Sequence, residues 1–141
     1  MGEIYYKYKS LNNFKHIVDI LLYKRLYASK YRDLNDPMEG IYVHDFNLDF
    51  NFVNNIHNGK DKLRICSLSK DKNNILMWSH YANGHRGIIL GVEIDQQKYE
   101  IEEITYSGIE VVKDININLN TPKQILSSKI NSWSYEDETV L

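Results

Sequence analysis

Residues 73–94, NNILMWSHYANGHRGIILGVEI, contain the strongest fold signals in this 141-residue chain. Residues 73–82 predict a short helix capped by one of the two leading asparagines, because asparagine side chains accept hydrogen bonds from the first free amides of a helix. The two glycines within 83–87 predict a turn. Residues 87–94 are the most apolar run of the chain and predict a central strand, since strands buried on both faces are continuously apolar.

The chain before this stretch is expected to begin with a strand and a helix. Residues 3–9 are rich in tyrosine and predict a strand, after which Ser10 is placed to cap an amphipathic helix of about three turns. The apolar residues at helical spacing in that helix are Leu11, Phe14, Val18, Leu21 and Leu22. Residues 25–29 predict a short strand and 30–40 a loop around Asn-Asp-Pro, whereas 41–61 fit either a weak helix or an extended segment.

The remainder of the chain adds strands and one further helix. Residues 63–69 predict a strand, and the alternation of polar and apolar side chains in 98–107 predicts another. Residues 121–131 predict a helix with Thr121 as its N-cap and a proline at the first helical position. The closing segment, 132–141, is a strand candidate.

These elements predict a single α+β domain that covers residues 1–141, a length typical of one domain. Helices and strands do not alternate in a βαβα rhythm. We therefore expect a mixed, mostly antiparallel sheet with a few short helices.

Composition favours a soluble, cytoplasmic protein. The net charge of −2 lacks the basic excess of a nucleic-acid surface, and no apolar run approaches the roughly 18 residues of a membrane span. The single cysteine, Cys66, cannot form an intrachain disulfide, which is typical of a reducing compartment. The heavy use of Lys, Asn, Ile and Tyr, residues with A/T-rich codons, favours a bacterium, phage or mobile element of low GC content, an origin compatible with a defence-related role.

Residues 34–40 (LNDPMEG) are either a plain turn or part of a ligand-binding loop. Turn chemistry alone explains Asn-Asp-Pro. A functional loop would direct polar groups into a cleft, and the candidates are Ser29, Asn35, Asp36 and Glu39.

Residues 66–69 (CSLS) end a predicted strand with two serines. Ser67 and Ser69 are ligand-binding candidates, although serines at a strand end more often cap the next element. A serine-hydrolase nucleophile is not indicated, because no Gly-x-Ser-x-Gly motif is present. Cys66 follows an apolar residue and is expected to be a buried structural thiol.

The densest group of chemically versatile side chains lies in residues 77–87 (MWSHYANGHRG). Trp78 is expected to be a core aromatic. Core packing explains the other candidates less well, and these are His80, Tyr81, His85 and Arg86. Zinc favours histidines one helical turn apart with a third ligand nearby, whereas this pair spans a turn without an evident third ligand, so no metal site is predicted.

Residues 132–138 (SWSYEDE) place Glu136 and Glu138 two positions apart. On a strand, both side chains would project from one face, where their charges repel each other. Such a pair is a candidate for catalysis. A solvated edge strand that uses charge to block aggregation is the alternative interpretation.

Taken in order, the segments YKY, LYASKYRDLNDPMEG, ICSLS, LMWSHYANGHRGIILGVE and SKINSWSYEDE resemble a bacterial family known as domain of unknown function 2971. The resemblance spans nearly the whole chain and is most specific over residues 76–93. Family members are usually longer and end their closing motif with an arginine, where this chain has Val140. The resemblance therefore implies a shortened member that lacks the C-terminal part of the family.

The layout is also reminiscent of ADP-ribosyltransferase folds, a likeness at the level of the fold rather than of a motif. Those proteins place an aromatic or polar residue on an early strand, a Ser or Tyr on the next and a glutamate on a late strand. The counterparts here are Tyr8, Ser29 and either Glu136 or Glu138. The analogy implies an NAD-using transferase in which a carboxylate stabilises an oxocarbenium-like state, Tyr8 or Tyr81 stacks on nicotinamide, and basic side chains contact the pyrophosphate.

Two other hypotheses remain open. The chain could be a non-catalytic binding module or inhibitor that retains the family pocket and binds a nucleotide-like ligand or a host protein target. It could also be a metal-dependent hydrolase that uses His80, His85, Asp36 and Glu39. In each case we expect residues 34–40 and 76–87 to flank a common pocket.

Overall fold

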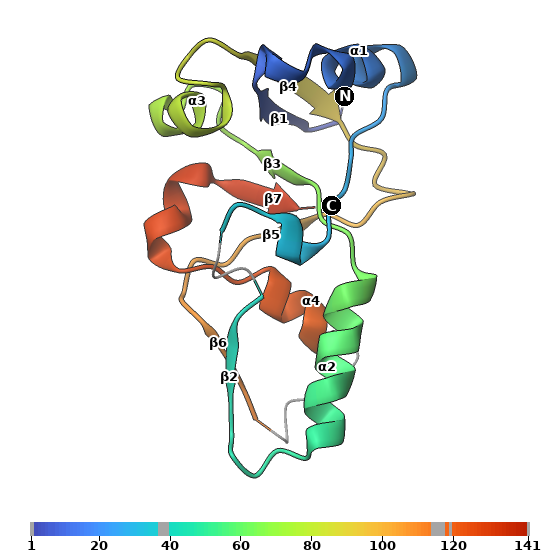
Figure 1. Cartoon of the computed structure of the whole chain (residues 1–141), viewed down its shortest axis with the longest axis vertical. Coiled ribbons are helices and arrows are strands. Elements are labelled where there is room, and N and C mark those ends of the chain that lie inside the picture. The colour runs from blue at the N-terminus through green and yellow to red at the C-terminus, as the bar shows by residue number, and fades with distance from the viewer. Residues whose placement is uncertain (1, 37–39, 114–117, 119, 141) are drawn as a thin grey trace. The chain divides into compact units, whose positions relative to one another are not determined.

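The computed structural model describes the whole chain except residues 1, 37–39, 114–117, 119 and 141 (Figure 1). The chain forms two compact units. Unit 1 comprises Met1–Ala28, Cys66–Glu102 and Tyr135–Leu141, and unit 2 comprises Ser29–Ile65 and Glu103–Ser134. Among the described helices, none is both long and apolar enough to cross a membrane.

A five-stranded sheet with the order β4–β1–β3–β7–β5 organises unit 1. Its strands are β1 (Ile4–Lys9), β3 (Ser67–Ser69), β4 (Ile88–Glu93), β5 (Glu102–Glu103) and β7 (Glu138–Val140). Strand β1 pairs antiparallel with β3 and with β4, and β3 pairs antiparallel with β7. At the edge of this sheet, β5 leads the chain into unit 2.

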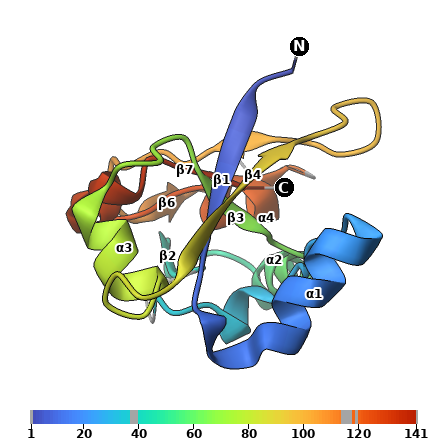
Figure 2. The same ribbon diagram turned by 90° about the horizontal axis from the view of Figure 1, so that it is seen from above.

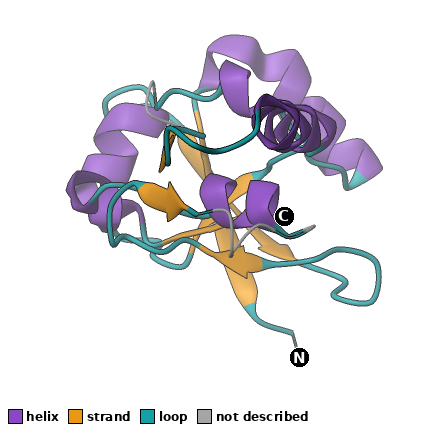
Figure 3. Cartoon of the chain, turned by 90° about the horizontal axis from the view of Figure 1, so that it is seen from below, coloured by secondary structure: helices purple, strands orange, loops and turns teal. Residues whose placement is uncertain are grey.

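Helices lie on both sides of the β1–β4 pair. The 3-10 helix η1 (Leu11–Asn13) and helix α1 (Phe14–Tyr23) follow β1, and helix α3 (Ile75–Tyr81) precedes β4. Figures 2 and 3 show α1 and α3 on opposite sides of these strands. The hydroxyl of Ser10 accepts a hydrogen bond from Asn12 N at 3.1 Å, so the predicted cap is present, although the first turn is a 3-10 helix.

Alternation along β1 separates two cores within unit 1. The core on the α3 side is centred on Tyr8, Met77 and Ala82. The core on the other side is centred on Tyr5, Cys66 and Leu68. Cys66 is a free, buried thiol, as predicted.

Unit 2 combines a two-stranded parallel sheet with helices. Its regular elements are β2 (Tyr42–His44), β6 (Glu110–Val112), α2 (Phe50–Lys62), α4 (Thr121–Leu126) and the 3-10 helices η2 (Tyr31–Asp33) and η4 (Asn131–Glu136), of which η4 ends in unit 1. Ile56, Val112 and Ile125 form its core. Segment 41–61, left open by the sequence, contains a strand followed by a helix.

The predicted α+β class is confirmed, and so are the strand at 3–9 and the helix at 73–82. Asn74 is the cap of α3, because its side-chain oxygen accepts from Met77 N at 3.1 Å. The predicted central position of 87–94 is wrong, since β4 lies at an edge of the sheet. Its side chains are only partly buried or exposed, and an apolar run by itself does not distinguish an edge strand from a central one.

Other predicted elements are shorter than expected. Segment 25–29 forms only an isolated bridge between Ser29 and Ile65, and 98–107 contains only the two residues of β5 and another isolated bridge. The N-cap of α4 is Asn120 rather than Thr121. This helix ends at Leu126 because the next two serines donate to Gln124 O, and such local bonds compete with helix continuation.

We expect Trp78→Ala to destabilise the fold by about 2–3 kcal/mol, at or below the lower end of the range for a fully buried aromatic. The Trp78 ring is half-buried, meets Tyr8 edge-to-face at 5.4 Å and donates from Nε1 to Lys72 O at 3.2 Å. Urea unfolding measures the loss. Leu76→Ala, on the exposed side of the same helix, is the matched control, and an equal loss in both variants would contradict a structural role for Trp78.

Candidate functional site

A row of three directly opposed residues crosses the centre of the sheet in unit 1. Tyr6 of β1 is paired with Ser69 of β3, and Ser69 is paired with Glu138 of β7. Directly opposed residues in antiparallel strands project to the same face. An aromatic ring, a hydroxyl and a carboxylate therefore follow one another across three adjacent strands.

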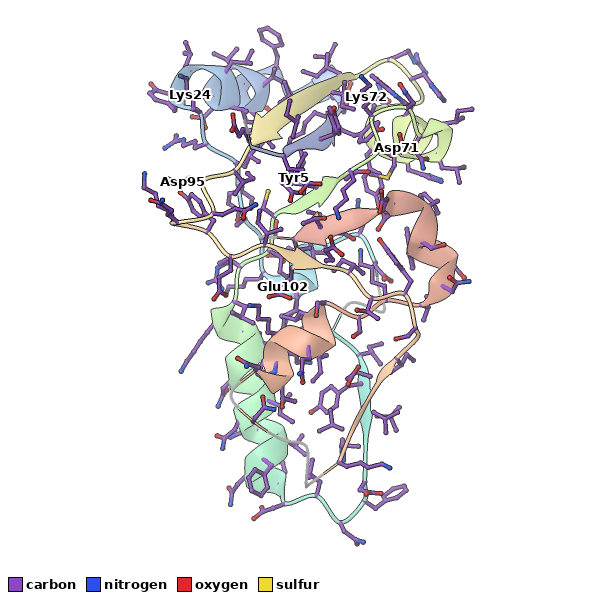
Figure 4. The ribbon with its side chains drawn as sticks, turned by 180° about the vertical axis from the view of Figure 1, so that it is seen from behind. Tyr5, Lys24, Asp71, Lys72, Asp95 and Glu102 are labelled. Atoms are coloured by element: carbon purple, nitrogen blue, oxygen red, sulfur yellow. The ribbon has the colours of Figure 1, made fainter. Side chains whose placement is uncertain are left out.

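Helix α3 places aromatic side chains on this face. Tyr6 and Tyr81 pack against the core centred on Tyr8, as do Trp78 and Tyr135. Tyr8 is buried and its hydroxyl donates to Asp71 O at 2.6 Å. Asp71, which is labelled in Figure 4, lies in the loop between β3 and α3. Burial raises the pKa of the Tyr8 phenol above its ordinary value, so this ring remains neutral and structural at physiological pH.

Hydrogen bonds from β3 and α3 hold the segment Tyr135–Glu138 in place. Ser69 Oγ donates to Glu136 O at 2.7 Å, and Asn74 Nδ2 donates to Tyr135 O at 2.6 Å. The hydroxyl of Tyr81 donates to Glu136 Oε1 at 2.5 Å. Since a bond to a carboxylate is a strong one, α3 fixes the Glu136 side chain directly.

The two carboxylates of this segment are both buried, Glu136 at 3% exposure and Glu138 at 7%. The prediction that they share a strand face is wrong. Glu136 ends η4, Asp137 adopts a left-handed conformation with φ 41°, and only Glu138 belongs to β7. The intervening turn changes the direction of the chain, which the period of a regular strand could not anticipate.

Exposed polar side chains surround this aromatic cluster. The ring of His85 stacks on Trp78 with a centroid distance of 6.5 Å and an interplanar angle of 12°. His80 lies against Tyr135, with ring centroids 6.0 Å apart. Arg86 follows in the same turn and is exposed. Two imidazoles and a guanidinium are thus accessible beside rings that can stack on a planar ligand.

Most of the predicted site residues fall in unit 1. These are Tyr8, Ser67, Ser69, His80, Tyr81, His85, Arg86, Glu136 and Glu138. Ser29, Asn35 and Asp36 belong to unit 2, and Glu39 lies outside the described residues. Within unit 1, the structure therefore brings together the motifs at 66–69 and 77–87 and residues 135–138 of the closing motif.

The hydroxyl of Ser69 is committed to the fold. Besides donating to Glu136 O, it accepts from Asp71 N at 3.1 Å, which is the capping role that its position at a strand end predicts. Ser67 instead uses its backbone, whose carbonyl accepts from Lys7 Nζ at 2.7 Å.

Three residues of this site were not predicted as such. Tyr6 is the aromatic residue opposite Ser69, Asn74 links α3 to the closing segment, and Tyr135 contacts His80. The alternation of Tyr6 with Tyr8 could have indicated a shared face. No sequence signal indicates a hydrogen bond between residues separated by sixty positions.

No group of three or more His, Cys, Asp or Glu side chains with metal-binding geometry occurs among the residues that the structure describes. The histidines of the site lie against aromatic rings. A planar organic ligand with polar groups suits this arrangement.

Burial raises the pKa of the Cys66 thiol above its ordinary value of 9.0, Lys7 and Lys9 oppose the shift, and Glu138 adds to it. The pKa of this thiol is therefore higher in the folded state than in the unfolded state. The stability that the protonated thiol contributes is fully present below about pH 9 and is lost as the pH rises through the folded-state pKa. We expect wild type to lose more stability than Cys66→Ala between about pH 8 and pH 10. Urea unfolding across that range measures the difference, and parallel losses would contradict it.

No family model, curated protein or solved structure matches this chain.

Proposed function

We propose that unit 1 is an NAD-binding module of the ADP-ribosyltransferase type, with Glu138 as the carboxylate that faces the reacting ribose. The observation that supports this best is the row of Tyr6, Ser69 and Glu138 on adjacent antiparallel strands. In this row, an aromatic residue on an early strand is followed by a serine on the neighbouring strand and by a glutamate on a late strand, which is the order that the fold analogy requires. Ser69, rather than Ser29, is the serine counterpart in this proposal.

The proposed reaction breaks the bond between nicotinamide and ribose. The bonding electron pair leaves with nicotinamide, and positive charge develops on the ribose in an oxocarbenium-like state. A carboxylate held beside that ribose stabilises the charge and can accept hydrogen bonds from its hydroxyls. A nucleophile of the target, or water, then bonds to the ribose carbon and releases a proton.

The proposed ligand contacts are the accessible side chains of the same site. Tyr81 and the Trp78–His85 stack offer planar surfaces to a nicotinamide or adenine ring. Arg86 and His85 are exposed and suited to the pyrophosphate. Glu136 positions Tyr81 through their hydrogen bond.

Incubation with NAD tests the proposal through two separate readouts. Release of free nicotinamide, measured by chromatography, reports cleavage, and a rise in melting temperature with NAD reports binding. Cleavage together with a thermal shift supports the enzyme. A protein that neither cleaves NAD nor changes its melting temperature in saturating NAD contradicts the proposal.

A second candidate is a non-catalytic binding module or inhibitor. The observation that favours it is the low exposure of both carboxylates, together with the use of the Tyr8 and Ser69 hydroxyls within the fold. A thermal shift without nicotinamide release distinguishes this candidate from the first.

Membership of the domain of unknown function 2971 family, an origin in a bacterium, phage or mobile element and a cytoplasmic location also belong to this proposal. The motifs at residues 76–93 and 132–138 support the family, and the free thiol of Cys66 is compatible with a reducing compartment.

A further inference from the structure

We propose that β4 pairs antiparallel with β4 of a second copy of this chain, so that the two sheets join across a two-fold axis. The proposal concerns the edge of the sheet in unit 1 and does not require that NAD binds, although it uses His85 and Arg86, which are also the proposed pyrophosphate contacts.

Strand β4 presents a complete unpaired edge. Each of its six residues is paired with a residue of β1 on one side. On the other side, no backbone hydrogen bond to Ile88–Glu93 occurs within the part of the chain that the structure describes. The free N–H and C=O groups of such an edge are a template for another strand.

The two edges of this sheet differ in how they resist strand addition. Strand β5 is two residues long and both are glutamates, and short, charged strands are typical of protected edges. Strand β4 has the sequence IILGVE, which contains no proline or lysine, and its only charge lies at the last position. Figure 1 shows β4 as a regular extended arrow. Strand β4, the longer and more apolar of the two edge strands, therefore lacks the features that prevent a second strand from pairing with it.

Charge complementarity identifies the partner as a second copy in antiparallel orientation. His85 and Arg86 precede β4, whereas Glu93 and Asp95 lie at its other end, and all four side chains are exposed. Within the chain, Glu93 accepts from Gly2 N at 2.6 Å and Asp95 pairs with Lys98 at 3.2 Å, and both contacts lie at the exposed surface, where a second cation can also approach. Antiparallel pairing of two copies brings the basic end of each strand beside the acidic end of the other. A parallel arrangement would place like charges together.

The hydrogen-bond pattern limits the register of this pairing. In an antiparallel ladder, two opposed residues direct their backbone groups either both toward or both away from each other. Because neighbouring residues of one strand direct these groups to opposite edges, a residue cannot oppose its own chain neighbour in the second copy. The two-fold axis must therefore pass beside a residue that opposes the same residue of the other copy. The two residues in the middle of β4 are Leu90 and Gly91. The attraction between a basic end and an acidic end then occurs twice in each dimer, because the interface is isologous.

The first test measures the mass of the intact chain by sedimentation at increasing concentration. We expect a reversible dimer of wild type and a dissociation constant about tenfold higher for Arg86→Glu, since the substitution replaces the attraction between a basic and an acidic strand end, which occurs twice in the dimer, by a repulsion. Adding Asp95→Lys to Arg86→Glu should restore dimerisation. Leu22→Glu, which alters an exposed apolar residue of α1, is the matched control and should dimerise like wild type.

The second test uses amide hydrogen exchange of the wild-type protein and requires no variant. We expect every second amide of Ile88–Glu93 to gain protection as the dimer forms, because the alternate amides already pair with β1. Three results would overturn the proposal: a monomer at concentrations up to about 1 mM, a dimer that Leu22→Glu disrupts and Arg86→Glu does not, or a dimer without new protection in β4.

Discussion

The variant Glu138→Gln is expected to cleave NAD about 100–1,000-fold more slowly than wild type, with little change in stability. Glutamine preserves the size of the side chain and its capacity to accept a hydrogen bond, but it removes the negative charge. If Glu138 stabilises the oxocarbenium-like state, that charge contributes more to the transition state than to the bound substrate, so the loss appears in kcat.

Asp137→Asn is the matched control for this variant. Asp137 is adjacent, exposed and in a left-handed conformation that asparagine also tolerates. Its backbone carbonyl, which the substitution leaves in place, accepts from Lys70 N at 3.0 Å. Single-turnover NAD cleavage and melting temperature are measured for wild type and both variants. Equal cleavage rates for wild type and a stably folded Glu138→Gln would exclude Glu138 as the catalytic carboxylate.

The variant Gly87→Ala is expected to lose about 3 kcal/mol or more of unfolding free energy. A Cβ atom at this position would lie 2.2 Å from Lys9 O and 2.9 Å from both Cα and O of Ala82. All three are backbone atoms, of β1 and of the end of α3, so no side-chain rotation relieves the overlap. The turn between α3 and β4 would move away from β1, and the Trp78–His85 stack with it.

Gly84→Ala, in the same turn, separates this steric effect from the intrinsic preference of glycine. Gly84 has φ +60°, and a Cβ atom there meets nothing within 4 Å. The variant should lose only about 1–2 kcal/mol, the typical cost of a left-handed conformation for a residue with a Cβ. Urea unfolding of both variants provides the comparison, and a loss at position 87 no greater than that at position 84 would contradict the steric argument.

The sequence predicted those elements whose signals are local. The helix at 73–82 was identified with its capping asparagines, because Asn74 bonds to the backbone three residues ahead. The strand at 3–9 and the α+β class followed from residue type and from the rhythm of the elements. The burial of Cys66 followed from its apolar neighbour in the predicted strand at 63–69.

The candidate site was predicted only as a set of separate motifs. The turn at Asp137, which puts Glu136 and Glu138 on different elements, depends on bonds to Ser69 and Lys70, far away in the chain. The Tyr81–Glu136 bond joins residues 55 positions apart. Neither pattern nor periodicity encodes such partners, because both describe a residue only relative to its near neighbours.

The sequence by itself determined which residues form helices and strands and which types of side chain are available for chemistry, since propensities, caps and alternation act within a few residues. Tertiary structure alone decided that Tyr6, Ser69 and Glu138 oppose one another and that β4 lies at an edge. The physical reason is that strand order and register are set by pairing between segments distant in the chain. The apolar sequence of β4 satisfies an edge position as well as a central one, and only its neighbours distinguish the two.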